Sequence, residues 1–153
     1  MKASELINIG SNKLKTNSIK SFILDSEILL SKVLNKKREE VLVDLNQKIE
    51  NNKILEFLKY IDRRALKEPI AYIIQQKEFW SRNFEVNNKT LIPRPETELM
   101  LEKLINIYKN KSINILDIGT GSGCIILTLL SELKRSKGTG IDISFGALQI
   151  AKK

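Results

Sequence analysis

The sequence predicts an α/β protein in three parts: a small helical bundle over residues 1–68, a β-hairpin connector over 69–92, and the start of a parallel α/β domain over 93–153. Three observations lead to this prediction. Apolar residues recur with helical spacing through the first part. An alternating pattern replaces that spacing in the second part. In the third part an apolar run, a glycine-rich turn and an apolar helix follow one another.

Four short amphipathic helices are predicted in the bundle. Ser4 is expected to cap the first helix, and Ser18 to cap the second, which carries a broad apolar stripe. A third helix is predicted at about residues 38–45. The fourth ends before Pro69, because proline disfavours the helical conformation in the residue that precedes it. The apolar stripes are interpreted as core packing, and the bundle contains no glycine-rich turn that would hold a cofactor.

The connector is predicted from a change of period. Ile70, Tyr72 and Ile74 alternate with smaller or polar residues, which is typical of a strand. The runs Glu78–Trp80 and Phe84–Val86 follow, and a polar turn closes the second run. Together these runs predict a β-hairpin.

The third part begins with a segment that contains two prolines, Leu91–Glu98, and a helix is predicted from Glu96 to about Tyr108. Taken alone, this segment is an ordinary helix start, with acidic side chains in the first turn and Arg94 available to pair with a carboxylate. Because it stands directly upstream of a glycine-rich turn, the balance shifts from an ordinary helix start towards a functional segment.

A buried parallel strand is predicted at Ile113–Ile118, and a helix from Cys124 onward. Between them glycine occupies every second position: Gly119, Gly121 and Gly123. Such glycines permit positive φ and let a ligand approach the backbone. A dinucleotide fingerprint would need a glycine at position 124, so the pattern favours a nucleoside cofactor without a pyrophosphate. The next strand, at about 139–143, ends near Asp142, whose carboxylate can accept hydrogen bonds from both ribose hydroxyls.

Composition narrows the classes of protein. The chain of 153 residues is 42% hydrophobic and 29% charged, and it contains no run of roughly 18 uncharged apolar residues that would span a membrane. The single cysteine, Cys124, excludes an intramolecular disulfide, which fits a cytoplasmic protein. With no histidine, a metal site is not expected, and a histidine-dependent catalytic triad is impossible within this chain.

The formal net charge of +8 raises the question of nucleic-acid binding. The basic residues are scattered, however, and the longest run is Lys36–Arg38. No aromatic residues are interleaved with that run. Direct binding to nucleic acid or to a membrane is therefore not expected.

Five segments carry a family resemblance: EPIAYI (68–73), EFW (78–80), LIPRPETE (91–98), ILDIGTGSG (115–123) and GID (140–142). Their order and spacing resemble those of the HemK/PrmC-type methyltransferases over essentially the whole chain. The glycine turn with Asp142 is similar to the S-adenosylmethionine site of a Rossmann-like methyltransferase. Enzymes of this family methylate the side-chain amide nitrogen, N5, of the glutamine in the Gly-Gly-Gln motif of peptide chain release factors. One departure is Gln75, where the family usually has glycine.

The resemblance implies a monomer with S-adenosyl-L-methionine as cofactor and release factors as protein partners. The residues that it implies for cofactor binding are Asp117, Gly119, Thr120, Gly121, Ser122, Gly123 and Asp142. Those implied to line the pocket where substrate enters are Pro93, Arg94, Pro95, Glu96 and Thr97. The bundle is expected to recognise the protein substrate.

The family's Asn-Pro-Pro-Tyr motif, which holds the target nitrogen, does not occur in this sequence. Only two strands of the expected sheet are predicted. The chain is therefore expected to be the N-terminal portion of a longer enzyme, with no catalytic residues of its own and without activity. Two alternatives stay open: a nucleic-acid N-methyltransferase of the N6-adenine type, and a release-factor binding module without catalysis. The helical N-terminal part and LIPRPETE argue against the first alternative.

Overall fold

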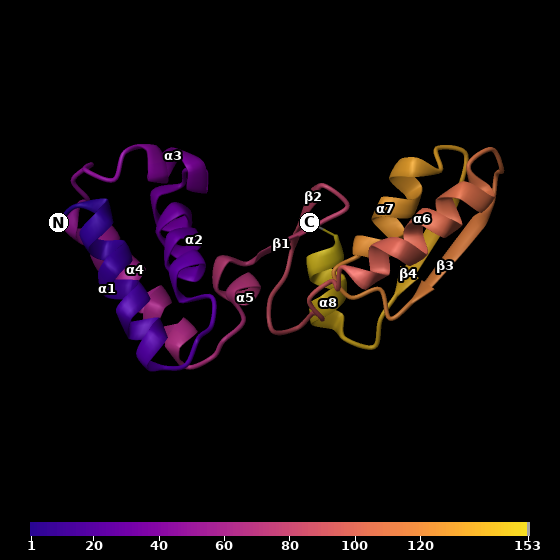
Figure 1. The fold of residues 1–153 in the computed structure, drawn as a ribbon. Helices are drawn as coiled ribbons and strands as arrows, with labels where there is room; N and C mark the ends of the chain where they lie inside the picture. Colours follow the sequence, from indigo (N-terminus) through magenta and orange to yellow (C-terminus); the bar gives the residue numbers. More distant parts are fainter. Residues whose placement is uncertain (153) are drawn as a thin grey trace. The chain divides into compact units, whose positions relative to one another are not determined.

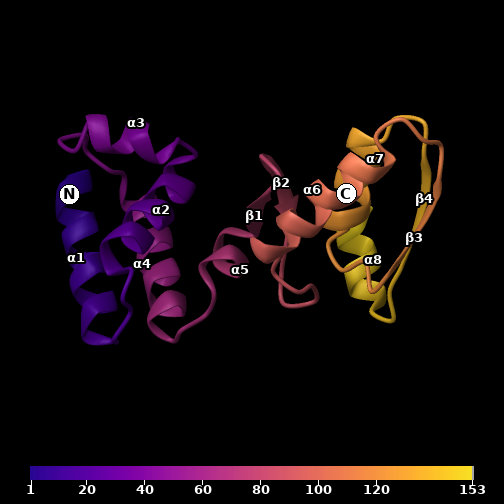
Figure 2. The same cartoon turned by 45° about the vertical axis from the view of Figure 1, so that its right-hand side comes forward.

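The computed structural model describes residues 1–152 and divides the chain into two compact units, Met1–Ile74 and the part that begins at Gln75 (Figures 1 and 2). Across the described residues there are eight helices and four strands. The predicted α/β class is therefore confirmed. The predicted three-part division and the role of each part stay predictions.

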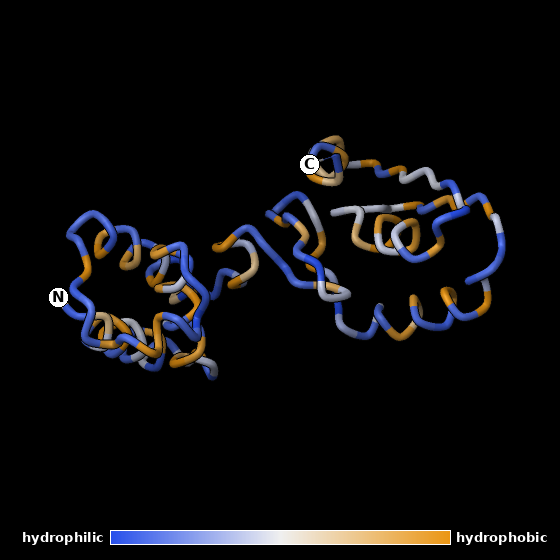
Figure 3. The backbone as a smooth tube through the Cα atoms, turned by 90° about the horizontal axis from the view of Figure 1, so that it is seen from above, coloured by the Kyte–Doolittle hydropathy of each residue, from blue (hydrophilic) through white to orange (hydrophobic). Residues whose placement is uncertain are grey.

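The first unit contains five helices: α1 (Ala3–Thr16), α2 (Phe22–Leu34), α3 (Arg38–Val43), α4 (Asn51–Ala65) and α5 (Ile70–Ile74). Hydrophobic and hydrophilic residues alternate in short stretches along each of the longer helices, as the hydropathy colouring shows (Figure 3). The apolar side chains of α1, α2 and α4 form one core. Its fully buried members include Leu6, Leu14, Leu29, Leu30, Phe57 and Ile61. Burial of these large side chains is the main stabilising contribution to the unit.

The predicted cap at Ser4 is wrong, because α1 begins at Ala3 and its N-cap is Lys2, two residues before Ser4. The Lys2 N–H donates to the Glu5 carboxylate at 2.8 Å. The N–H groups of Ala3 and Ser4 donate to backbone carbonyls at Gln47 and Leu45, at 3.1 and 3.0 Å. Residues distant in sequence thus satisfy the free donors of the helix start, so no side-chain cap at Ser4 is needed.

The predicted cap at Ser18 is also wrong. Ser18 has a φ of 60°, and its N–H donates to the Lys15 carbonyl at 3.0 Å, so it belongs to the C-terminal turn of α1. Helix α2 starts at Phe22. A residue in the left-handed region after the last helical turn is a common helix end.

Two ion pairs hold α2 to its neighbours. Asp25, which is 4% exposed, accepts a hydrogen bond from Arg64 of α4 at 2.6 Å. Glu27 pairs with Arg38 of α3, also at 2.6 Å. These carboxylates lie within the apolar stripe of α2, and their partners neutralise them where water is largely excluded.

The strand predicted from the alternation of Ile70, Tyr72 and Ile74 is wrong, because these residues form helix α5. The N–H groups of Tyr72 and Ile73 donate to the Pro69 carbonyl at 3.0 and 3.2 Å. The fixed φ of proline suits the first turn of a helix. Gln75 follows with a φ of 57°, which is the left-handed conformation that glycine adopts without strain.

The second unit begins with an antiparallel hairpin of β1 (Gln76–Phe79) and β2 (Arg82–Glu85). Helix α6 (Glu96–Tyr108) comes next and has the predicted bounds. A βαβ unit completes the described chain: β3 (Asn114–Ile118), α7 (Cys124–Glu132) and β4 (Lys137–Ile141), followed by α8 (Phe145–Ala151). Strands β3 and β4 are parallel, with Asp117 opposite Gly140. Strand β4 ends two residues earlier than predicted, so Asp142 directly follows it.

The helices of this unit lie on one side of the β3–β4 pair (Figure 2). Their core includes Phe79 and Phe84 from the hairpin, Leu101 from α6, and Leu129 from α7. The side chains on the opposite face of the strands are exposed, among them Leu116 at 59% and Ile118 at 76%. The parallel pair therefore has one covered face and one open apolar face. Parallel strands usually have both faces covered.

Candidate functional site

The candidate site is built around the turn between β3 and α7. The N–H groups of Gly119 and Thr120 both donate to the Ile141 carbonyl, at 2.8 and 3.0 Å, which ties the turn to the end of β4. The Gly123 N–H donates to the Thr120 carbonyl at 2.8 Å. The three glycines have φ values of 80°, 56° and 79°. This backbone path lies in the left-handed region, where other residues are strained.

The glycines differ in what surrounds them. A side chain at Gly119 would meet nothing within 4 Å, and the nearest atom to one at Gly121 would be the Gly119 carbonyl oxygen at 4.0 Å. A side chain at Gly123 would lie 3.0 Å from Leu127 and 3.2 Å from Ala151. The first two glycines therefore border open space that a ligand can occupy, whereas Gly123 allows α7 and α8 to pack closely.

Asp117 and Thr120 fix the first half of the turn. The Thr120 hydroxyl donates to the Asp117 carboxylate at 2.8 Å, and Thr120 is only 6% exposed. A side chain at Gly140 of β4 would lie 2.8 Å from the Thr120 hydroxyl oxygen, so glycine there makes room for this contact. Asp117 thus has the position expected of a residue that orients the turn. Its part in cofactor binding stays a prediction.

Asp142 holds the second half of the turn. One carboxylate oxygen accepts from the Gly121 N–H and the other from the Ser144 N–H, both at 2.8 Å. The backbone hydrogen bonds from Ser144 and Gly121 lower the pKa of Asp142, so the group is charged at neutral pH. Each oxygen retains a second lone pair for a ligand hydroxyl. The sequence suggested the ligand contact but gave no sign that Asp142 also supports the turn.

Residues Pro93–Thr97 form the entry to α6. Pro93 is buried, Arg94 and Glu96 are exposed, and the Thr97 N–H donates to the Arg94 carbonyl at 3.0 Å. Arg94 forms no salt bridge with any residue between 1 and 152. Whether Arg94 has a role beyond pairing with a carboxylate stays open. That the segment lines a ligand pocket stays a prediction.

Sequence reasoning missed the contact between the hairpin turn and α6. Trp80 and Ser81 form this turn with φ values of 52° and 53°. The Trp80 N–H donates to the Glu98 carboxylate at 2.8 Å, and its indole N–H donates to Glu132 at 3.2 Å. Two-residue hairpin turns of this kind usually contain glycine or asparagine. No such residue signals the turn here.

The remaining candidate chemistry is limited. Burial raises the pKa of the Cys124 thiol, so the thiol is protonated and a poor nucleophile at neutral pH. Within residues 1–152 no three histidine, cysteine or acidic side chains are close enough to share a metal ion. None of the helices described has the length and apolar character needed to cross a membrane.

The fold and the turn together define a class of protein: a helical unit followed by a βαβ unit whose glycine turn and flanking carboxylates leave room for a ligand. Residues 5–74 match the family model described as the PrmC N-terminal domain. The chain as a whole is similar to the N-terminal portion of release factor glutamine methyltransferases, which confirms the resemblance read from the sequence motifs.

Three relatives illustrate this similarity. A release factor glutamine methyltransferase of Buchnera aphidicola subsp. Baizongia pistaciae is 43% identical over 154 residues, which cover 100% of this chain and 55% of the relative. One of Nitratidesulfovibrio vulgaris is 36% identical over 146 residues, or 95% of this chain and 50% of the relative. A bifunctional methyltransferase of Rickettsia prowazekii is 37% identical over 167 residues, which cover 97% of this chain and 32% of the relative. The chain thus spans about half the length of the first two and about a third of the last.

Proposed function

We propose that this chain carries the substrate-recognition and cofactor-binding portions of a protein-glutamine N-methyltransferase that acts on peptide chain release factors. The methyl group is transferred to N5 of the glutamine in the Gly-Gly-Gln motif. The observation that carries the proposal is the open space at Gly119 and Gly121, in a chain similar along its full length to relatives named for this activity.

The proposed cofactor is S-adenosyl-L-methionine, held in a Rossmann-like domain of which β3, α7 and β4 are the start. It supplies an electrophilic methyl group on a sulfonium centre. The residues fit such a ligand, because the turn exposes backbone where a side chain would obstruct it and Asp142 offers free lone pairs for hydroxyl groups. Gly119–Gly123, Asp117 and Asp142 would hold the cofactor, and Pro93–Thr97 would line the substrate side.

The contribution of these residues is orientation. The hydrogen bonds of Asp117 and Asp142 fix the turn before any ligand arrives, so little reorganisation is needed on binding. Methyl transfer from a sulfonium requires alignment more than acid–base catalysis, and the absence of histidine is compatible with it.

Residues 1–153 alone are proposed to be inactive. They contain no Asn-Pro-Pro-Tyr motif to hold the glutamine amide, and the apolar face that bears Leu116 and Ile118 is open. The first unit, which matches the PrmC N-terminal domain, is proposed to bind the release factor and not the cofactor.

A chimera tests the proposal. Residues 1–153 are joined to the C-terminal half of the Buchnera aphidicola relative, and methyl transfer from radiolabelled S-adenosylmethionine to a release factor is measured. We expect transfer by the chimera, none by residues 1–153, and none by a chimera carrying Gly121→Val, whose branched side chain fills the open space at the turn. Deletion of residues 1–74 should reduce release-factor methylation far more than cofactor binding.

The same assay includes DNA and RNA as acceptors. Methylation of nucleic acid in place of a release factor would contradict the proposal and support the N6-adenine alternative. A folded chimera that binds the release factor but never transfers methyl groups would support the binding-module alternative.

A further inference from the structure

The second unit carries a basic surface where helices α6 and α7 end and strands β3 and β4 begin. Two segments form it, Lys-Asn-Lys-Ser at residues 109–112 and Lys-Arg-Ser-Lys at residues 134–137, and we call them the basic turns. Figures 1 and 2 show them side by side at the same end of the β3–β4 pair. Basic residues that are distant in the sequence thus gather on one edge of the unit.

Three hydrogen bonds join the basic turns. The Ser112 hydroxyl donates to the Arg135 carbonyl at 2.8 Å, and the Ser136 hydroxyl accepts from the Ile113 N–H at 3.3 Å. The Lys137 N–H donates to the Ile113 carbonyl at 3.0 Å. The expectation that the chain does not bind nucleic acid rested on the scatter of its basic residues along the sequence, and the fold removes that scatter here.

The basic turns contain five basic residues and three small polar ones, without an acidic or an apolar residue. All five basic residues are exposed, and none forms a salt bridge with a residue between 1 and 152. Glu132 is the nearest acidic residue along the chain, and its carboxylate accepts a hydrogen bond from the Trp80 indole N–H at 3.2 Å. The positive charge of the basic turns is therefore not neutralised within the described part of the chain.

The helix ends account for only part of this charge. Helices α6 and α7 end just before the basic turns, and a cation at the C-terminus of a helix is stabilised by the helix dipole. This effect falls off within the last turn of a helix. It can explain Lys109 and Lys134, whereas Lys111 and Lys137 lie farther along the chain and need another explanation.

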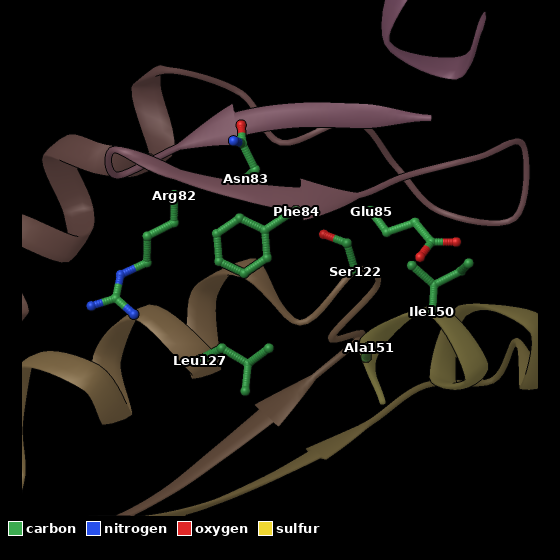
Figure 4. Close-up of a pocket in the computed structure, with 8 residues that line it drawn as sticks. All are labelled: Arg82, Asn83, Phe84, Glu85, Ser122, Leu127, Ile150 and Ala151. Carbon is green, nitrogen blue, oxygen red and sulfur yellow. The ribbon is translucent and has the colours of Figure 1, made fainter. Parts of the chain in front are cut away.

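The charges at the cavity beneath strand β2 are arranged differently (Figure 4). Arg82 and Glu85 line that cavity together, so their opposite charges offset one another. The glycine turn is flanked by two carboxylates, Asp117 and Asp142. The basic turns, in contrast, concentrate charge of one sign, and such a patch raises the local concentration of an anionic partner.

We propose that the basic turns bind the backbone of an RNA duplex. Lysine and arginine side chains neutralise neighbouring phosphates and release their counterions. The Ser112 hydroxyl can still accept a hydrogen bond and the Ser136 hydroxyl can still donate one, which suits the 2′-hydroxyl groups of RNA. The inference does not depend on the proposed function, because it concerns binding and not methyl transfer.

Three other partners fit this surface less well. A protein interface usually has an apolar or aromatic centre, and the basic turns contain no such side chain. Single strands stack their bases on exposed aromatic rings, whereas Tyr108 is partly buried and Lys111 Nζ lies 5.2 Å from the centre of its ring. Reading of DNA in the major groove needs a helix or a β-ribbon, and two short turns supply neither. The wide, shallow minor groove of an RNA duplex instead presents its 2′-hydroxyls and phosphates to a surface of this kind.

The surface is distant from the candidate site. Strands β3 and β4, of five residues each, run from the basic turns to the glycine turn. At about 3.3 Å per residue this is a separation of about 16 Å. RNA can therefore bind at the basic turns without contact to Gly119 and Gly121.

Fluorescence anisotropy of a short labelled RNA duplex, titrated with the 153-residue chain, tests the proposal. We expect saturable binding whose logarithmic salt dependence has a slope of up to about −4.5, at about 0.9 for each neutralised phosphate. Replacing three lysines of the basic turns by glutamine should reduce that slope by about 2.7 and weaken binding at low salt about tenfold or more. The variant is Lys111→Gln with Lys134→Gln and Lys137→Gln.

Two matched variants separate local from overall charge. Lys20→Gln with Lys32→Gln and Lys59→Gln removes the same charge from exposed positions of the first unit and should leave RNA affinity unchanged. Arginine at the three lysine positions of the basic turns keeps the charge and should keep the affinity. Circular dichroism melting of each variant checks that it is folded. A lower melting temperature with unchanged RNA affinity would assign the lysines to the helix ends alone and overturn the proposal.

The same titration has other outcomes that would overturn the RNA surface. Equal losses in the basic-turn variant and in the first-unit variant would show that only the net charge matters. Binding of a DNA duplex of the same sequence as tightly as the RNA would remove the role of the 2′-hydroxyls. Displacement of the RNA by polyglutamate at a lower concentration of charges than by unlabelled RNA would assign the surface to an acidic protein.

Discussion

Replacing Gly10 by alanine should destabilise the first unit, although alanine is normally the better helix former by about 1 kcal/mol. Gly10 lies in the middle of α1. An added Cβ would lie 2.5 Å from Ser26 Oγ and 2.8 Å from atoms of Ile61 and Phe57. Ile61 and Phe57 are fully buried, so moving them disturbs a close-packed core. The Ser26 hydroxyl donates to the Ile7 carbonyl at 3.0 Å, and the new methyl group would displace it.

The expected magnitude follows from these contacts. Overpacking a core costs about 1–3 kcal/mol, and loss of the Ser26 hydrogen bond costs about 1 kcal/mol. After the gain in helix propensity, the unfolding free energy should fall by about 1–3 kcal/mol. For a domain of this size that lowers the melting temperature by roughly 10 °C.

Urea unfolding followed by circular dichroism at 222 nm measures the change. Asn12→Ala, at an exposed position of the same helix, is the matched control and should be neutral or slightly stabilising. Adding Ser26→Ala to Gly10→Ala should recover part of the loss, because it removes the nearest contact. A Gly10→Ala variant as stable as the control would refute the packing argument.

Three further predictions concern single side chains. Arg64→Met should lower the unfolding free energy by about 3–5 kcal/mol, since it leaves the buried Asp25 carboxylate without its partner; a loss below about 1 kcal/mol in urea unfolding would contradict this. Gln75→Gly should stabilise the left-handed turn by about 1 kcal/mol and slow amide exchange at Val86, whose N–H donates to the Gln75 carbonyl. The pKa of Asp142 is lowered, so its stabilising effect is complete above the ordinary aspartate pKa of about 3.9 and disappears as the pH falls through the lower folded value. The amide resonance of Gly121 should titrate with that lower value, and titration at an ordinary aspartate pKa would count against the hydrogen bond.

The sequence predicted the βαβ unit well because its signals are local. The apolar run that ends at Ile118 and the three alternating glycines mark a strand, a turn and the first residue of α7 within a residue or so. At Gln75 the structure explains a feature of the family pattern that the sequence alone did not. The family resemblance places glycine there, and the structure explains it, because this position has positive φ.

The sequence failed where distant residues decide local structure. The start of α1 is set by carbonyls from Gln47 and Leu45, which no cap signal at Ser4 could reveal. The error at residues 70–74 has a local cause: the alternation of this short run fits a strand or a single helical turn equally well, and the hydrogen bonds to the neighbouring Pro69 carbonyl belong to the helix.

The hydrogen bond between Trp80 and Glu98 joins two of the segments that carry the family resemblance, EFW (78–80) and LIPRPETE (91–98). Trp80 and Ser81 are both in the left-handed region, a strained state for side chains of their kind. The hydrogen bonds to Glu98 and Glu132 oppose that strain. Glu98 therefore joins the hairpin to the first turn of α6, the helix that follows Pro93–Thr97. Small displacements of groups around a reacting centre reduce rates severely, so a fixed start of α6 fits the proposal that Pro93–Thr97 line the substrate side. The acidic residue at position 98 is thus explained by the geometry of the hairpin turn that it supports.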